Sequence, residues 1–316
     1  MKHAFLIIAH NNWNQLCRFI KAIDSEKCDF FVHVNSKINL QKETVDAVML
    51  SAEKSKITFS KRIPITWGDF GICEASMVLL KTARNSGGYD YYHLLTGNDL
   101  LLKNIDEFDY FFERNLFSNI SSHGKENHKT NYMRLEIANE KISERIKYYN
   151  ILIFLYKNKN YAVRKTATAI NKIGKLFQNF FQIDRLKNLN EDLYYGSTWW
   201  SITDEFAEYF LQRRAWIINH FGKHTFAADE FVPQTIIMNS IFRDSVFDRK
   251  DFLDKSLRLI DWGDGDGYGS PHVWRFIDKE AIDGSNALIA RKFDEQVDHE
   301  IVDYILNKLE SVESEL

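Results

Sequence analysis

Short apolar runs alternate with amphipathic stretches along the first hundred residues. Apolar residues recur at helical spacing over 13–23, and a second helix is expected over 71–84. Four apolar runs bounded by polar residues are typical of buried strands, and they lie at 4–9, 29–34, 56–60 and 89–95. Strands that alternate with crossover helices predict an α/β fold with a central, mostly parallel sheet.

Polar residues stand where the expected strands end. His10 follows the first strand, Asn35 follows the second, and 96–99 follows the fourth. In open α/β sheets, ligands bind beyond the carboxyl ends of parallel strands. We therefore expect a nucleotide-binding edge formed by these three loops.

The second half of the chain has a different order of elements. A strand is expected over 193–202, a helix over 204–218, and a further helix that opens at 229–230. A glycine-rich loop follows at 263–269. We interpret this loop as a flexible cover over a ligand.

Residues 141–187 stand out by their charge. They hold eleven Lys and Arg against only Glu144 and Asp184, so the segment carries about +9 and the rest of the chain about −12. Aromatic and aliphatic residues are interleaved with these charges. Such basic helices are typical of elements that bind a membrane surface or a partner, and an ordinary pair of helices packed on the core has the same pattern.

No repeat or low-complexity tract interrupts the chain, and three prolines make no interdomain linker. We therefore expect a single domain over 1–316. Within it we expect a nucleotide-binding half at 1–104, a basic helical insertion at 141–187, and an acceptor-binding and catalytic half at 193–294.

Composition and charge exclude several classes of protein. With 41 Lys and Arg against 44 Asp and Glu, the net charge is −3, so no overall basic field attracts nucleic acid. Cys17, Cys28 and Cys73 form neither a C-x-x-C pair nor an even framework, which argues against a zinc site or disulfides. The apolar run 4–9 is too short for a signal peptide or a membrane span. These features predict a soluble, unprocessed, cytoplasmic protein.

Several sequence motifs are absent. The chain has no G-x-x-x-x-G-K-[ST] phosphate loop, no G-x-G-x-x-G after a strand, no G-x-S-x-G and no H-E-x-x-H. Asp264 and Asp266 resemble the start of a calcium loop, but Tyr268 and Arg275 stand where further oxygen ligands are required. Kinases, Rossmann dehydrogenases, elbow hydrolases and zincins are therefore disfavoured.

A pair of adjacent carboxylates is the sharper chemical signal. Asp229 and Glu230 follow an apolar segment, and Trp199 and Trp200 lie on the expected neighbouring strand. Tryptophan faces stack on sugar rings, and a nearby carboxylate can accept a proton from a sugar hydroxyl. The alternative interpretation is that the two carboxylates only cap a helix N-terminus.

Eight blocks in fixed order carry a family resemblance. The blocks are IIAHN (7–11), FVHVNSK (31–37), ITWGDFGICEA (65–75), HLLTGNDLLLKN (93–104), YYGSTWWSIT (194–203), TFAADEFVPQTI (225–236), LRLIDWG (257–263) and LIARKFD (288–294). With these blocks in this order, the chain resembles the core-2/I-branching β-1,6-N-acetylglucosaminyltransferase and peptide O-xylosyltransferase family, glycosyltransferase family 14, as a bacterial-type member.

The resemblance implies an inverting, metal-independent enzyme of the GT-A type that uses a UDP-sugar donor and no cofactor. It places the general base on Glu230. Basic side chains would stabilise the leaving diphosphate in place of a metal ion. This role carries over to Arg275 and Lys292, with Arg291 and Arg258 as near candidates.

The resemblance also implies residues that bind the nucleotide and the sugars. Asn35 departs from the family, which usually has Asp there, and Pro233 replaces a Trp that is common in vertebrate members. The nucleotide-binding candidates are Ile8, His10, Asn35 and Trp67. The sugar and acceptor candidates are Asp99, Trp199, Trp200, Asp229 and Trp262.

These features predict an enzyme that extends or branches a surface polysaccharide or a lipid-linked oligosaccharide. N-acetylglucosamine is the favoured sugar, and the insertion at 141–187 would contact anionic lipid on the inner face of the cell membrane. A non-catalytic protein that binds nucleotide sugars or glycans is one alternative. A metal-dependent GT-A enzyme that uses Asp264 and Asp266 is another.

Overall fold

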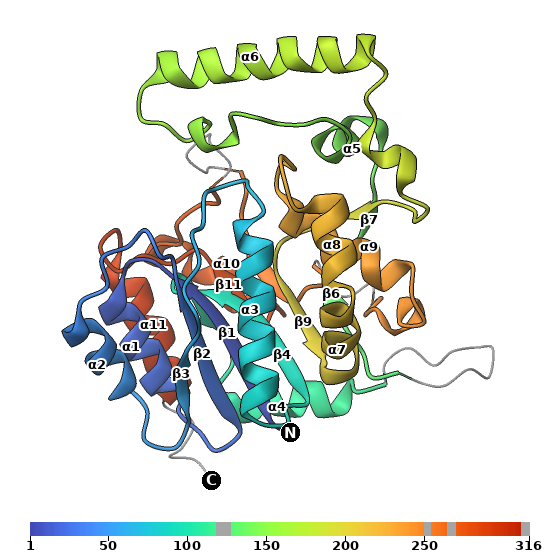
Figure 1. Cartoon of the computed structure of the whole chain (residues 1–316). Coiled ribbons are helices and arrows are strands. Elements are labelled where there is room, and N and C mark those ends of the chain that lie inside the picture. Colours follow the sequence, from blue (N-terminus) through green and yellow to red (C-terminus); the bar gives the residue numbers. More distant parts are fainter. Residues whose placement is uncertain (118–127, 250–253, 264–269, 311–316) are drawn as a thin grey trace.

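Six strands form the central sheet of the structure, a computed structural model that describes residues 1–117, 128–249, 254–263 and 270–310. Their order is β3-β2-β1-β4-β9-β6 (Figure 1). The first four strands along the chain are parallel, β9 is antiparallel to β4, and β6 is antiparallel to β9. The predicted α/β fold with a mostly parallel sheet is confirmed. The strands are β1 (His3–Ala9), β2 (Cys28–Val34), β3 (Ile57–Phe59), β4 (Tyr91–Thr96), β6 (Tyr132–Met133) and β9 (Trp200–Thr203).

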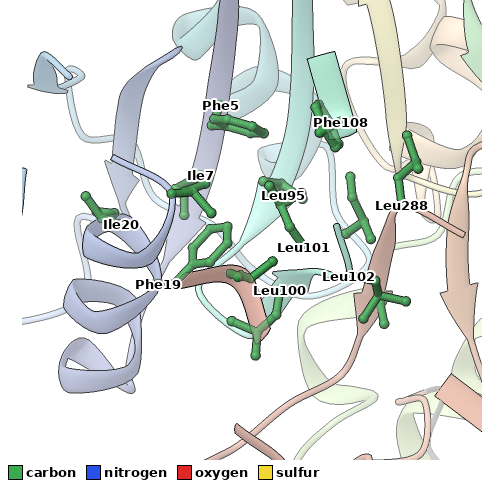
Figure 2. Close-up of a cluster of buried hydrophobic side chains, with 14 of the residues drawn as sticks. Phe5, Ile7, Phe19, Ile20, Leu95, Leu100, Leu101, Leu102, Phe108 and Leu288 are labelled. Atoms are coloured by element: carbon green, nitrogen blue, oxygen red, sulfur yellow. The ribbon is translucent and has the colours of Figure 1, made fainter. Parts of the chain in front are cut away.

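Strand β1 is buried along its whole length because helices cover both faces of the sheet. Phe5 and Ile7 face a core shared with α1 (Trp13–Ala22) and α11 (His299–Glu310). Leu6 faces the opposite core, shared with α3 (Gly71–Ser86). Figure 2 shows the first of these cores, in which Phe19 and Ile20 of α1 lie near Ile7. This two-sided burial explains why the strand has no polar alternation.

The strand register brings three loops to one edge of the sheet. Ala9 of β1 pairs with Val34 of β2, and Ile8 pairs with Thr96 of β4. The strands therefore end side by side, and the order of connections reverses at β1, which has β2 on one side and β4 on the other. Such a reversal opens a crevice between the loops that follow the strands.

A second sheet has three strands, the first of which follows β4 directly in the chain. Its strands are β5 (Asp99–Leu101), β11 (Ile289–Arg291) and β10 (Arg258–Ile260), in the order β10-β11-β5. β11 runs antiparallel to β5, with Arg291 opposite Asp99. This pairing carries the C-terminal Arg-Lys segment to the carboxyl edge of the main sheet.

The prediction of one continuous strand over 193–202 is wrong. Two short strands replace it: β8 (Tyr194–Tyr195), which pairs with β7 (Glu136–Ile137), and β9. The chain turns at Gly196, where an added Cβ would lie 1.9 Å from the carbonyl oxygen of Arg134. This close backbone approach admits only glycine, and it ends the first strand.

Two expected helices are also corrected. The helix expected over 204–218 is two helices, α7 (Asp204–Gln212) and α8 (Arg214–Phe221). The helix expected to open at 229–230 starts later, as α9 (Val232–Met238), and a 3-10 turn, η3 (Ala228–Glu230), holds the two carboxylates.

The insertion contains most of the remaining helical structure. α5 (Glu140–Lys147) leads to η1 (Ile153–Leu155), the long helix α6 (Tyr161–Phe180) and η2 (Arg185–Asn188). Figure 1 shows α6 at the end of the molecule that is far from the N-terminus. The other elements are α2 (Lys42–Met49), α4 (Ile105–Arg114), η4 (Arg243–Ser245), η5 (Phe276–Asp278) and α10 (Lys279–Asp283).

A chain of buried polar groups crosses the core beneath β1 and β4. Asp109 accepts hydrogen bonds from the N-terminal ammonium at 2.9 Å and from His3 Nε2 at 3.1 Å. The other ring nitrogen of His3 lies 3.0 Å from His93 Nε2, and His93 Nδ1 lies 2.8 Å from Ser201 Oγ. Burial lowers the pKa of both histidines, most strongly that of His93.

This buried pair predicts that acid destabilises the protein. In the unfolded chain, His3 and His93 take up protons as the pH falls through about 6.5. In the folded chain their lowered pKa keeps them neutral, so the free energy of unfolding should fall by up to about 1.4 kcal/mol per pH unit for each proton. Urea unfolding between about pH 7.5 and 5 measures this slope. His93→Gln should flatten it, and His299→Gln, at the exposed start of α11, should leave it unchanged; identical slopes in all three proteins would contradict the prediction.

Candidate active site

A cavity of about 650 Å³ opens at the carboxyl edge of β1, β2 and β4. The predicted site residues that it brings together come from segments far apart in the chain. They are Ile8, His10, Asn35, Trp67, Trp199, Asp229, Glu230, Trp262, Arg291 and Lys292.

His10 lies directly after β1, beside the basic segment that follows β11. Burial lowers the pKa of its imidazole, and the positive charges of Lys292 and Arg291 lower it further. A neutral imidazole can both donate and accept a hydrogen bond. His10 therefore suits recognition of a polar ligand group at this edge.

Asn35 binds the protein's own backbone after β2. Its Nδ2 donates to the carbonyl oxygen of Ile65 at 2.8 Å, and its Oδ1 accepts from the amides of Ile65 and Lys37 at 3.0 and 3.1 Å. A carboxylate cannot donate to a carbonyl, so the amide matches this pairing where the family usually has Asp. Asn35 thus positions the segment that carries Trp67.

Trp67 is contacted by two side chains of the protein. Its ring meets Phe226 edge to face at 5.6 Å between centroids, and Lys157 Nζ lies 4.6 Å from the ring centroid. Gly68 follows with φ of 77°, and a Cβ there would lie 2.7 Å from Phe226. These contacts hold the indole against the cavity wall.

Arg291 is oriented by a buried carboxylate. Its guanidinium donates to Asp99 Oδ1 and to Thr96 Oγ1, both at 2.7 Å, and lies 4.4 Å from the ring centroid of Trp199. Asp99 is 2% exposed and is absent from the cavity lining. Asp99 thus contacts Arg291 rather than the cavity, and its position does not support the expected sugar contact.

Lys292 lines the same cavity next to Arg291. Within the part of the chain that the structure describes, its ammonium makes no ion pair with a carboxylate. A cation that keeps its charge uncompensated can attract an anionic ligand such as a diphosphate.

Besides Asp99, three predicted site residues lie outside the cavity lining. Arg258 is 3% exposed, and its guanidinium donates to Ser201 Oγ and to the carbonyl oxygens of Leu94, Trp200 and Ser256, so its position does not support diphosphate binding. Burial lowers its pKa to about 10.

Trp200 and Arg275 are the other two. Trp200 is buried in the core at 2% exposure, because neighbouring strand residues point to opposite faces and Trp199 takes the cavity side. Arg275 is exposed at the start of η5, where its amide donates to Asp278.

The two adjacent carboxylates have different surroundings. Glu230 Oε2 accepts from Arg145 at 2.7 Å, and the Arg145 guanidinium lies between the rings of Phe226 and Phe231, 5.1 and 4.9 Å from their centroids. Asp229 is buried, and its Oδ2 accepts from Thr198 Oγ1 at 2.6 Å.

The second oxygen of Asp229, Oδ1, is buried without a hydrogen-bond partner. Burial, together with the negative charge of Glu230, raises the pKa of Asp229 to about 6. Asp229 therefore lines the cavity as a carboxyl group whose ionisation is disfavoured. The helix-capping interpretation of the pair is wrong, because neither side chain caps η3 or α9 with a hydrogen bond.

The backbone fixes the carboxylate turn from two sides. Ala227, at φ of 53°, donates its amide to Gly68, and the Glu230 carbonyl accepts from Gly196 at 2.8 Å. The turn is thereby tied both to the Trp67 segment and to the loop between β8 and β9.

Arg145, Lys157 and Thr198 line the cavity but were missed as individual site residues. Thr198 stands inside the YYGSTWW block, next to the predicted site residue Trp199, so its place in the sequence could have identified it as a site residue. Arg145 and Lys157 are two of the eleven basic residues of the insertion, and nothing in the sequence distinguishes them from the other nine.

Metal ligands are not gathered in the described ranges. No group of three His, Cys, Asp or Glu side chains suited to a metal ion occurs there. Asp264 and Asp266 lie outside the residues that the structure describes.

No helix in the described ranges is long and apolar enough to cross a membrane.

The fold and the cavity at the carboxyl edge of the sheet are those of α/β proteins that bind a nucleotide-linked ligand there. The chain belongs to the family described as Core-2/I-Branching enzyme, whose sequence profile matches residues 3–284. It is therefore a glycosyltransferase that uses a nucleotide sugar, with the GT-A type of fold that this family implies. Membership of an enzyme family sets aside the non-catalytic alternative.

Three solved structures are similar to this chain. Core-mannan synthase A from Aspergillus fumigatus, in an Mn/GDP form, is 10% identical over 77% of this chain and 70% of its own, with a TM-score of 0.32. The mannosyltransferase Ktr4p from S. cerevisiae, in complex with GDP, is 11% identical over 79% and 71%, with a TM-score of 0.33. Mouse xyloside xylosyltransferase 1 is 11% identical over 91% and 96%, with a TM-score of 0.34. No curated protein matches the chain.

Proposed function

We propose that this chain is an inverting glycosyltransferase that moves a sugar, with N-acetylglucosamine favoured, from a UDP-sugar to a hydroxyl of a glycan. The observation that carries the proposal is that Glu230 and Lys292 line one cavity at the carboxyl edge of the sheet. A base and a diphosphate-binding cation are the two groups that direct displacement requires.

Glu230 acts as the general base in this mechanism. Arg145 occupies Oε2 and fixes the orientation of the carboxylate, which leaves Oε1 toward the acceptor. Oε1 takes the proton of the acceptor hydroxyl while the acceptor oxygen bonds to the anomeric carbon. The bond from that carbon to the diphosphate breaks, and its electron pair leaves with UDP. Attack opposite the leaving group inverts the configuration and forms a β linkage from an α-linked donor.

The leaving diphosphate is stabilised by Lys292 and Arg291. Two cations can offset the developing negative charge without the ligand geometry of a divalent ion. Asp99 supports this role because it holds the Arg291 guanidinium beside Thr96 at the end of β4. The uracil and ribose bind at the loops after β1 and β2, near Ile8, His10, Asn35 and Trp67.

The donor and acceptor sugars bind between the carboxylates and the tryptophans. Trp199 and Trp262 are the aromatic residues offered to the sugars in the cavity lining, and Asp229 lines the same cavity. The acceptor is a glycan in surface polysaccharide or lipid-linked oligosaccharide synthesis. The enzyme acts from the cytoplasmic side, with the basic insertion in peripheral contact with the inner face of the cell membrane. All these groups belong to one domain over 1–316.

Replacing Glu230 tests the base. Glu230→Gln removes the proton acceptor and keeps the side-chain shape, so sugar transfer should fall by about 10²–10⁴-fold while UDP binding is unchanged. UDP release with acceptor measures transfer, and calorimetry measures UDP binding. Glu144→Gln, on the same helix as Arg145, is the matched control and should keep full activity. Full activity in Glu230→Gln together with its loss in Asp229→Asn would move the base to Asp229.

Replacing Lys292 tests the diphosphate site. Lys292→Gln should lower kcat by about 10²–10³-fold and weaken UDP binding, because one charge opposite the leaving group is lost. Arg275→Gln removes an equal charge at a position outside the cavity lining and should leave both quantities unchanged. Steady-state kinetics and UDP titration compare the two variants. The reverse result would assign the diphosphate to Arg275.

Metal independence is tested by chelation. If Lys292 and Arg291 supply the positive charge, transfer should proceed at an unchanged rate after dialysis against excess EDTA. Added Mn²⁺ or Mg²⁺ should then change the rate less than twofold. Loss of transfer in EDTA with recovery on Mn²⁺ would support the alternative, a metal-dependent enzyme that uses Asp264 and Asp266.

A further inference from the structure

Helix α6 presents its apolar side chains to solvent. Five of them recur at intervals of three and four residues, so they lie on one side of the helix. We call this side the outer face of α6. Its members and their exposed fractions are Ile170 (43%), Ile173 (54%), Leu176 (67%), Phe177 (61%) and Phe180 (80%).

The side of α6 that faces the protein is polar. Asn171 Nδ2 donates to the Tyr156 hydroxyl at 2.7 Å, and its Oδ1 accepts from the Ile151 amide. Gln178 accepts from the Tyr149 amide at 2.7 Å and donates to the Tyr149 carbonyl. The usual orientation of a surface helix, with its apolar stripe toward the core, is thus reversed. Hydrogen bonds hold the helix while its largest hydrophobic groups stay outside.

Positive charge accompanies the outer face. The twenty residues of α6 contain no Asp or Glu. Lys165 and Lys172 are exposed and lie about three turns and one turn before Leu176, on one flank of the outer face. Phe181, 66% exposed, extends the apolar surface beyond the end of the helix. Apolar groups beside cationic side chains match the chemistry of an interface between water and anionic lipid.

We propose that the outer face of α6 docks on an anionic lipid surface, with the aromatic rings at the level of the acyl chains. Lysines beside the rings meet the lipid phosphates. A second copy would present the same positively charged face, because α6 contains no Asp or Glu, so charge favours an anionic lipid surface over a second copy.

Docking through α6 also places the cavity beside the lipid surface. The insertion that carries α6 supplies Arg145, which binds Glu230, and Lys157, which covers Trp67. Resting on the proposed function, this arrangement brings the base close to an acceptor whose lipid end is embedded in the same surface. The donor, which is soluble in water, reaches the cavity from solution.

Vesicle binding tests the docking surface with the full chain. Sedimentation with vesicles of one part phosphatidylglycerol to three parts phosphatidylcholine should carry down the wild type, and phosphatidylcholine alone should bind far less. Phe177→Ser/Phe180→Ser should weaken binding by at least about tenfold, because two large side chains no longer enter the apolar layer. Lys165→Gln/Lys172→Gln should weaken it by about fivefold for each lysine and reduce its salt dependence.

The matched control is Leu50→Ser/Ile277→Ser, which removes two equally exposed apolar groups elsewhere (83% and 88%) and should bind like the wild type. Circular dichroism confirms folding of each variant. Transfer to a water-soluble acceptor should be unchanged in Phe177→Ser/Phe180→Ser. Vesicle binding then measures docking, and this transfer rate measures catalysis independently of docking. Equal vesicle binding by wild type and the Phe177→Ser/Phe180→Ser variant would overturn the proposal. So would a wild-type dimer that this variant dissociates, without any vesicle binding.

Discussion

The rest of the structure depends on one strand that is buried on both faces. β1 lies between β2 and β4 in a parallel register, with one core beneath it and another above. Because its backbone bonds are satisfied on both edges and its side chains on both faces, the strand cannot shift without disrupting two cores. The loops after β1, β2 and β4 are therefore held at one edge, and the cavity forms between them.

Ion pairs and backbone contacts bring the chemical groups to this edge. Asp99 and Arg291 lie nearly two hundred residues apart, yet β5 and β11 pair them in one small sheet. Glu230 is held by Gly196 from one side and by Arg145 from the insertion on the other. Two cations that line the cavity, Arg145 and Arg291, are thus each held by an ion pair with a carboxylate.

The four parallel strands, the edge at which they end and part of the cavity lining were predictable. Glu230, Lys292 and His10 stand in the ordered blocks that carry the family resemblance, and that resemblance, rather than any one local pattern, singles them out. Arg258 and Trp200 occur in similar blocks but are buried in the core. A pattern along the chain does not distinguish a cation at a cavity from one that binds buried carbonyl oxygens, because that difference depends on which distant segment covers it.

The amino-acid sequence alone determined the α/β class, the sheet edge and the carboxylate pair, because hydrophobic periodicity and residue chemistry are local properties. Tertiary packing determined the break at Gly196, the contact of Asn35 with Ile65 and the reach of Arg145 to Glu230. It also turned the apolar side of α6 outward, although the same periodicity normally predicts a helix packed on the core. Each of these outcomes depends on a partner far away in the chain, and such a partner is specified only when the cores around β1 have formed.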